Sequence, residues 1–85
     1  MKLLSNAQLA SPIVRWEFER DHRHLMCALR ATSADSSYEV ATVPLWDGGR
    51  TVVETFNSPS AALWRHAAIA ADLRSAGWMV AAYTT

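Results

Sequence analysis

Near the start of the chain, the stretch IVRWEFER at 13–20 alternates between apolar and polar side chains, and a mainly apolar stretch, HLMCALRA at 24–31, follows it closely with Leu25, Cys27 and Leu29 on one face. A period of two with bulky apolar residues predicts half-buried strands. The short polar stretch between them predicts a hairpin. On this pattern, the apolar face of the hairpin carries Val14, Trp16, Phe18, Leu25, Cys27 and Leu29.

Two further strands are predicted after the polar loop TSADSS, at 38–45 and 50–57. Pro44 cannot donate a ladder hydrogen bond, so it belongs at a strand end or an edge. The segment WDGGR between these strands is the strongest turn signal in the chain. Asp-Gly and Gly-Gly predict the positive φ values of a tight hairpin turn.

A single long helix is predicted over 60–76, where the sequence is rich in alanine. Ser58 suits the N-cap and Pro59 the first helical position, where a missing N–H costs nothing. Gly77 suits the left-handed residue that ends a helix. A short fifth strand, WMVAAYT, follows at 78–84.

The element order predicts an α+β fold, an antiparallel β-meander of four strands with one long α-helix packed on one face and a short C-terminal fifth strand (β-β-β-β-α-β). If the strands alternate in direction, the fifth runs antiparallel beside the first, giving the spatial order 5-1-2-3-4. A terminal strand swapped into a partner's sheet is the main alternative. Residues 1–12 are interpreted as an N-terminal arm and 13–85 as one domain.

Charge and cysteine content narrow the classes of function. Eight basic and eight acidic side chains cancel, so the chain has no general attraction for nucleic acid backbones or anionic membranes. Cys27 is the only cysteine, which rules out an internal disulfide and suits the cytoplasm. No apolar stretch approaches the length of a signal peptide core or a membrane span.

The stretch ERDHRH at 19–24 raises the question of a metal or acid–base site. Imidazole and carboxylate groups suit zinc, nickel or copper, and His66 could add a ligand to His22 and His24. However, His22 falls in the predicted turn, and no paired metal-ligand spacing accompanies it. We interpret the stretch as the solvated tip of the hairpin and expect no metal or other cofactor.

Nucleophilic catalysis is not favoured either. Cys27 needs a base to form a thiolate, and His24 lies three residues away on the opposite face of the strand. No G-x-S-x-G motif is present. On the predicted helix, His66 falls in the apolar stripe and is interpreted as a core residue. A non-catalytic protein is expected, with a small metal- or ligand-binding enzyme centred on His22, His24 and His66 as one alternative.

The second alternative is a single-stranded nucleic-acid binder that uses its sheet face, because aromatic residues on a sheet can stack bases. Four arginines against three carboxylates give residues 13–31 a net charge of only +1, so nucleic acid is an unexpected partner. Solvent exposure of Trp16 and Trp46 would favour this alternative.

Trp64 does not fit the predicted core. At about 100° per residue it lies opposite Leu73, away from the stripe of Ala62, His66, Ile69, Leu73 and Ala76. A large aromatic residue among small ones on the outer side of a helix indicates a contact surface, with a lone surface tryptophan or a cover by the N-terminal arm as alternatives. We therefore expect a homodimer that acts by protein association. The predicted interface comprises Trp64, Ala68, Ala71 and Ser75.

Overall fold

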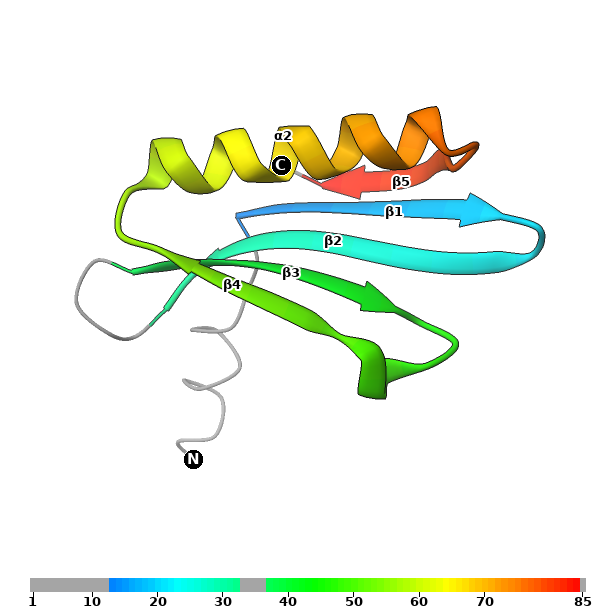
Figure 1. The fold of residues 1–85 in the computed structure, drawn as a ribbon, viewed down its shortest axis with the longest axis horizontal. Helices are drawn as coiled ribbons and strands as arrows, with labels where there is room; N and C mark the ends of the chain where they lie inside the picture. The colour runs from blue at the N-terminus through cyan, green and yellow to red at the C-terminus, as the bar shows by residue number, and fades with distance from the viewer. Residues whose placement is uncertain (1–12, 33–36, 85) are drawn as a thin grey trace.

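The computed structural model describes residues 13–32 and 37–84, so the predicted N-terminal arm lies outside the described residues. Five strands form one antiparallel sheet, and a long helix lies against one side of it (Figure 1). The predicted α+β fold and its β-β-β-β-α-β order are confirmed. The elements are β1 (Val14–Arg20), β2 (Arg23–Ala31), β3 (Tyr38–Pro44), the 3-10 helix η1 (Gly48–Arg50), β4 (Val52–Phe56), α2 (Pro59–Ser75) and β5 (Met79–Thr84).

The spatial order of the strands is β4-β3-β2-β1-β5, as predicted, and β5 runs antiparallel to β1 of the same chain. The connection between the two edge strands is α2. Its 17 residues rise about 25 Å, close to the length of a seven-residue strand. The helix therefore returns the chain to the end of the sheet from which β5 can run beside β1.

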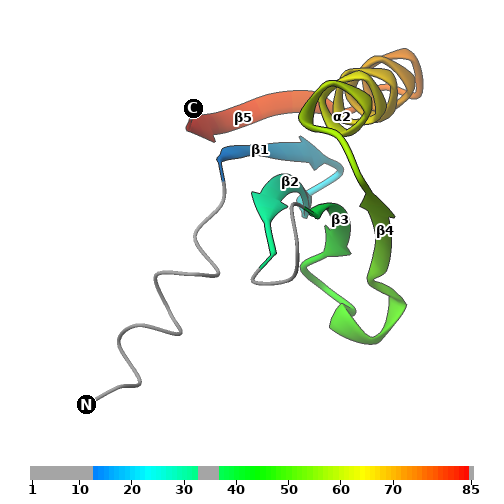
Figure 2. The same ribbon diagram turned by 90° about the vertical axis from the view of Figure 1, so that its left-hand side faces the viewer.

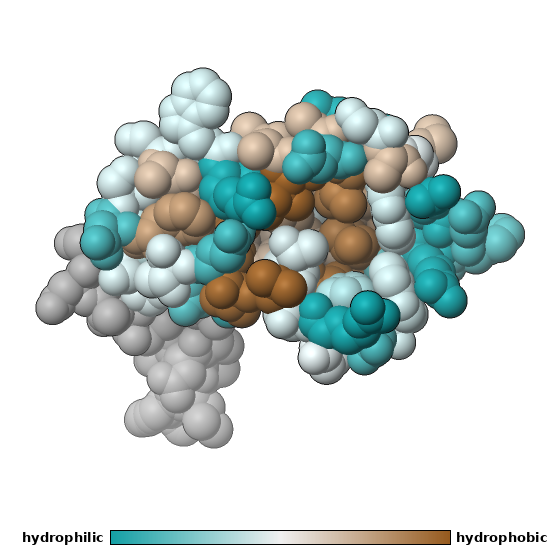
Figure 3. All heavy atoms as spheres, in the orientation of Figure 1, coloured by the Kyte–Doolittle hydropathy of each residue, from teal (hydrophilic) through white to brown (hydrophobic). Residues whose placement is uncertain are grey.

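The core lies between α2 and the concave side of the sheet, which curls around the helix in Figure 2. The predicted apolar face of the β1–β2 hairpin points into this core. In the orientation of Figure 3, hydrophobic residues show in the middle of the face below the helix. The residues buried between the sheet and the helix are Phe18, Leu25, Cys27, Leu29 and Val40 of the sheet with Ala62, His66 and Ala70 of the helix, and Ala28 and Ala41 are buried on the other face of the sheet.

The tight turn of the protein is not where the glycines predict it. The segment 45–51 makes a longer connection that includes η1, where the Thr51 hydroxyl donates to the Gly48 carbonyl at 2.7 Å, and neither glycine there has a positive φ. The two-residue turn lies instead between β1 and β2, where Asp21 and His22 have φ of 51° and 66°. This confirms the hairpin tip and corrects the prediction for WDGGR.

Both ends of α2 follow the predicted capping residues. The Ser58 side chain accepts a hydrogen bond from the Ala61 amide at 3.1 Å, which satisfies one of the free N–H groups of the first turn. At the other end Gly77 has φ of 95°. The amide of Trp78 donates to the Leu73 carbonyl at 2.9 Å and that of Gly77 to Arg74 at 3.0 Å. These two bonds are those of a Schellman motif.

The predicted core stripe of the helix needs two corrections. Ala76 is exposed because the helix ends at Ser75 and Ala76 forms its cap. Ala70 is buried although the stripe omitted it, because this side of α2 faces β1. No helix of the described part of the chain is long and apolar enough to cross a membrane.

Candidate association surface

The structure places the four predicted interface residues on the outer side of α2. Trp64 is 77% exposed, and Ala68, Ala71 and Ser75 are also exposed. Trp64 therefore lies opposite the side of the helix that meets the sheet, as its position on a helical wheel predicts. An indole this exposed leaves a large apolar area in water.

The apolar surface around Trp64 is larger than the sequence indicated. Leu63, which the prediction omitted, is half exposed. Ser60, Leu63, Trp64 and Ala67 line a shallow hollow of about 320 Å³. Leu63 precedes Trp64 by one residue, so a helical wheel places it on the flank of the helix rather than on its outer ridge.

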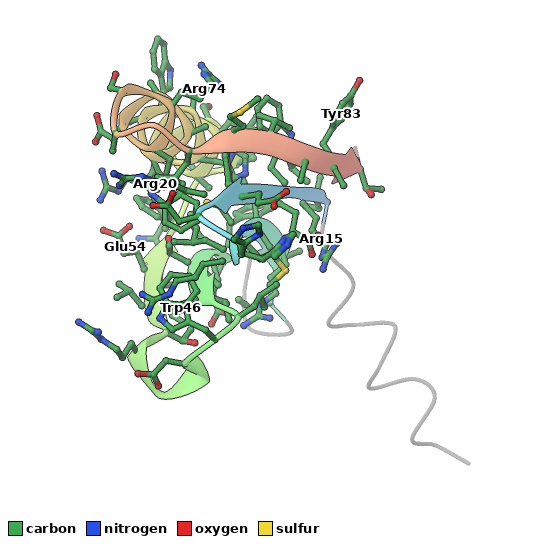
Figure 4. All side chains as sticks on the ribbon, turned by 90° about the vertical axis from the view of Figure 1, so that its right-hand side faces the viewer. Arg15, Arg20, Trp46, Glu54, Arg74 and Tyr83 are labelled. Carbon is green, nitrogen blue, oxygen red and sulfur yellow. The ribbon has the colours of Figure 1, made fainter. Side chains whose placement is uncertain are left out.

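A second hollow, of about 260 Å³, lies between this flank and the sheet. It shares Leu63 and Ala67 with the first hollow and reaches Trp16 on β1. Next to Trp16 stands Tyr83 of β5, with ring centroids 5.7 Å apart. Tyr83 is 67% exposed and projects on the helix side of β5 (Figure 4). The two hollows therefore join α2 to Trp16 of β1, and Tyr83 of β5 lies beside Trp16.

The opposite flank of α2 is polar. Arg65 donates to the Glu54 carboxylate of β4 at 2.9 Å. The apolar surface therefore extends from the outer side of α2 over one flank only. Arg74 is the charged residue among those that line the second hollow. We define the association surface as the predicted residues Trp64, Ala68, Ala71 and Ser75 together with Leu63, Ala67 and Tyr83.

Beneath this surface lie two groups that could carry chemistry, but both are held neutral by the core. Burial raises the pKa of the Cys27 thiol to about 11, against a smaller opposing effect of its hydrogen bond with Thr42. The Nε2–H of His66 donates to the Cys27 carbonyl at 3.2 Å. Burial lowers the pKa of His66, and this hydrogen bond opposes the shift. The pair serves packing rather than nucleophilic attack, because a buried thiol with a raised pKa is a poor nucleophile.

The three histidines do not come together. His66 points into the core, whereas the register β1–β2 pairs His24 with Glu19, on the other side of the sheet. His22 lies in the hairpin turn. Within residues 13–32 and 37–84, no three His, Cys, Asp or Glu side chains are grouped as metal ligands would be.

The sheet face turned away from α2 offers no stacking platform. The strand registers put every aromatic residue of the five described strands on the helix side. On the open face, Arg15 pairs with Glu17 at 3.2 Å and Arg30 with Glu39 at 3.0 Å. Of the two tryptophans whose exposure would favour nucleic-acid binding, Trp16 is only partly accessible and Trp46 is 42% exposed.

No protein family model matches the chain, and neither the curated proteins nor the solved structures contain a significant match.

Proposed function

We propose that the protein is a non-catalytic domain that works by association with a second copy of itself through the association surface. The observation that carries this proposal is the grouping of exposed apolar side chains on one side of the molecule: Trp64 and Leu63 line one hollow, a second hollow leads from Leu63 to Trp16, and exposed Tyr83 lies against Trp16. Isolated exposed apolar residues are common on protein surfaces, but a continuous patch that includes aromatic residues is characteristic of an interface. The buried, single Cys27 is compatible with a cytoplasmic location, which we also infer.

A second copy fits this surface better than a charged partner does. The chain has no net charge, and the seven residues that define the association surface are uncharged, with Arg74 beside them in the second hollow. Two copies can therefore approach with little net repulsion. A two-fold axis would set each patch against the same patch of the partner, and the alanines beside Trp64 would let the helices come close.

The energy available from Trp64 alone is substantial. Burying a tryptophan removes roughly 150–250 Å² from water, worth roughly 4–6 kcal/mol before the costs of association. Interface energy is usually concentrated in a few such aromatic residues. One substitution at this position should therefore decide between monomer and dimer.

The direct test is the oligomeric state at micromolar concentration, measured by sedimentation equilibrium or light scattering. Wild type is expected to be a dimer and Trp64→Glu a folded monomer. The substitution would bury a charge at the interface, yet it leaves the core intact because Trp64 is 77% exposed.

Val53→Glu provides a matched control. Val53 is 46% exposed and its register pairs it with Ala41, on the sheet face turned away from α2, so this variant should remain dimeric. A monomeric wild type would contradict the proposal. A Trp64→Glu protein that stays dimeric would show that association uses another surface.

A further inference from the structure

Three connections of the chain meet at one end of the sheet, far from Trp64. They are the β1–β2 turn, the β3–β4 connection and the link from α2 to β5. Figure 4 looks onto this end, with Arg20 and Trp46 labelled. The rings of Trp46 and Trp78 are stacked there, with centroids 5.9 Å apart and planes 10° from parallel. The guanidinium carbon of Arg23 lies 5.1 Å from the centre of the Trp46 ring.

Backbone hydrogen bonds hold the two loops that carry these indoles. Trp78 follows Gly77 in the Schellman motif and its amide is bonded to the Leu73 carbonyl. The amide of Leu45, next to Trp46, donates to the His24 carbonyl at 3.0 Å. The stack therefore joins two loops that are each tied to a regular element, which pre-organises it for a ligand.

The Arg20 side chain lies next to Gly77. A Cβ at position 77 would be in ordinary van der Waals contact with it, 3.5 Å from Nε. Arg20 is half exposed, and its one ion pair within the described ranges is a long one with Asp21, at 3.7 Å. Its guanidinium keeps donors for a further partner.

A hollow of about 360 Å³ lies among these residues. It adjoins a second hollow of about 480 Å³, and the two share Arg20 and Asp21. The volume of the 360 Å³ hollow falls within the range of small-molecule sites. The residues that line this hollow are Arg20, Asp21, Arg23, Trp46 and Trp78.

We propose that this end of the sheet binds a nucleotide, whose base takes the place of the Arg23 guanidinium over Trp46 of the Trp46–Trp78 pair and whose phosphate is held by Arg20 and Arg23. This site lies outside the association surface and does not depend on it. Indole faces stack bases, and guanidinium groups match phosphate oxygens in charge and geometry. Two cations against one carboxylate disfavour a metal ion, and the charged lining disfavours a purely apolar ligand.

The test follows the indole N–H signals of the protein by NMR during titration with adenosine 5′-monophosphate. The chain has four tryptophans, so four signals serve as separate reporters, assigned by single Trp→Phe variants. The signals of Trp46 and Trp78 are expected to shift in a saturable way, whereas those of Trp16 and Trp64 stay in place. Adenosine alone should bind about tenfold more weakly or worse, because it lacks the charged hydrogen bonds of the phosphate.

Two variants and one control locate the site. Arg23→Gln and Trp46→Leu should each weaken binding about tenfold or more. Arg50→Gln removes the same charge from the neighbouring η1, outside the lining, and should leave binding unchanged. Circular dichroism confirms that each variant is folded.

A five-nucleotide single-stranded DNA distinguishes the source of the nucleotide. Tighter binding of this strand than of the mononucleotide assigns the site to an unpaired nucleotide of a strand, and weaker or equal binding assigns it to a free nucleotide. The proposal is overturned if neither probe shifts the two signals at millimolar concentration. It is also overturned if folded Arg23→Gln and Trp46→Leu proteins bind as wild type does.

Discussion

At the scale of single residues, the core sets the chemistry of Cys27 and His66. The Cys27 side chain is fully buried, and His66 is linked to it through the Cys27 carbonyl. Burial favours the neutral form of both groups, since a charged form would lose its hydration. Labelling of the Cys27 thiol and protonation of His66 are therefore both expected to be easier in the unfolded chain than in the native protein.

Cys27 should react with an aromatic disulfide reagent only when the protein unfolds. The thiol is inaccessible, and its pKa near 11 leaves almost no thiolate at neutral pH. Labelling of the native protein is expected to be about a thousandfold slower than in urea, in line with typical opening equilibria. The time course of absorbance with and without urea measures this. Fast, stoichiometric labelling of the native protein would contradict the burial of this strand.

Stability should fall as the pH is lowered from 7 to 5, in part because of His66. Its pKa is lowered in the folded state, so below the usual histidine value near 6.5 the unfolded chain binds a proton that the native protein does not. One such group contributes a slope of at most about 1.4 kcal/mol per pH unit. The contribution of neutral His66 to the free energy of unfolding is therefore complete above pH 6.5 and decreases as the pH falls below that value.

Urea denaturation at pH 7, 6 and 5 measures this slope. His66→Gln is the comparison, because glutamine keeps an N–H donor for the Cys27 carbonyl but does not titrate. The variant should show a flatter pH dependence than wild type over this window. Identical slopes would exclude His66 as the source.

Trp16→Phe should change stability little, despite the loss of a large ring. The indole N–H of Trp16 is buried and finds no hydrogen-bond partner in the part of the chain that the structure describes, which costs about 1–3 kcal/mol. Its removal offsets the lost apolar contact, so the expected change in unfolding free energy is within about 1 kcal/mol. Phe18→Ala, at a fully buried neighbour, should cost about 3–5 kcal/mol. Chemical denaturation compares the two, and a loss above about 2 kcal/mol for Trp16→Phe would refute the offset.

At the scale of the elements, strict local patterns were predictable and loop geometry was not. The period-two strands and the capped helix depend on neighbours in the sequence, so Ser58 and Gly77 could be assigned from the chain alone. The tight turn could not, because Asp21 and His22 occupy the left-handed region that glycine usually fills. The register of β1 and β2 imposes this turn, which overrides the local preference of its residues.

Two glycine substitutions distinguish a glycine that occupies the left-handed region from one that does not. Gly77→Ala should cost about 1–2 kcal/mol of stability, because alanine is strained at the φ of 95° found there. Gly48→Ala should be neutral or slightly stabilising, since its φ is not positive and a Cβ there meets nothing within 4 Å. Urea denaturation of both variants checks this, and equal losses would show that Gly48 also has a special conformation.

At the scale of the whole molecule, only part of the candidate site could be read from the sequence. Trp64 was predictable because its position on the helix follows from a fixed angle per residue. The contribution of Leu63 and Tyr83 was not, because it depends on where α2 sits over the sheet. The stack of Trp46 on Trp78 joins residues from two loops, and no local pattern connects them.

Association should also appear in the thermal stability of the whole molecule. If the folded protein is a dimer, mass action makes its melting temperature rise with protein concentration. Wild type is expected to show this rise over a hundredfold range of concentration, measured by circular dichroism. The Trp64→Glu protein should melt at one temperature throughout, and a wild-type melting temperature independent of concentration would argue against the dimer.

The pairing of β1 with β5 has a consequence for synthesis of the chain. Arg15 is paired with Thr84, about 70 residues later, so β1 is an inner strand only once the last strand has been made. At about 5–20 residues per second, several seconds separate the two. During that time the nascent chain presents the edge of β1 without its outer neighbour, next to Trp16 and Phe18. A ribosome-bound chain that stops before β5 should therefore attract chaperones or aggregate, even though its first hairpin is already complete.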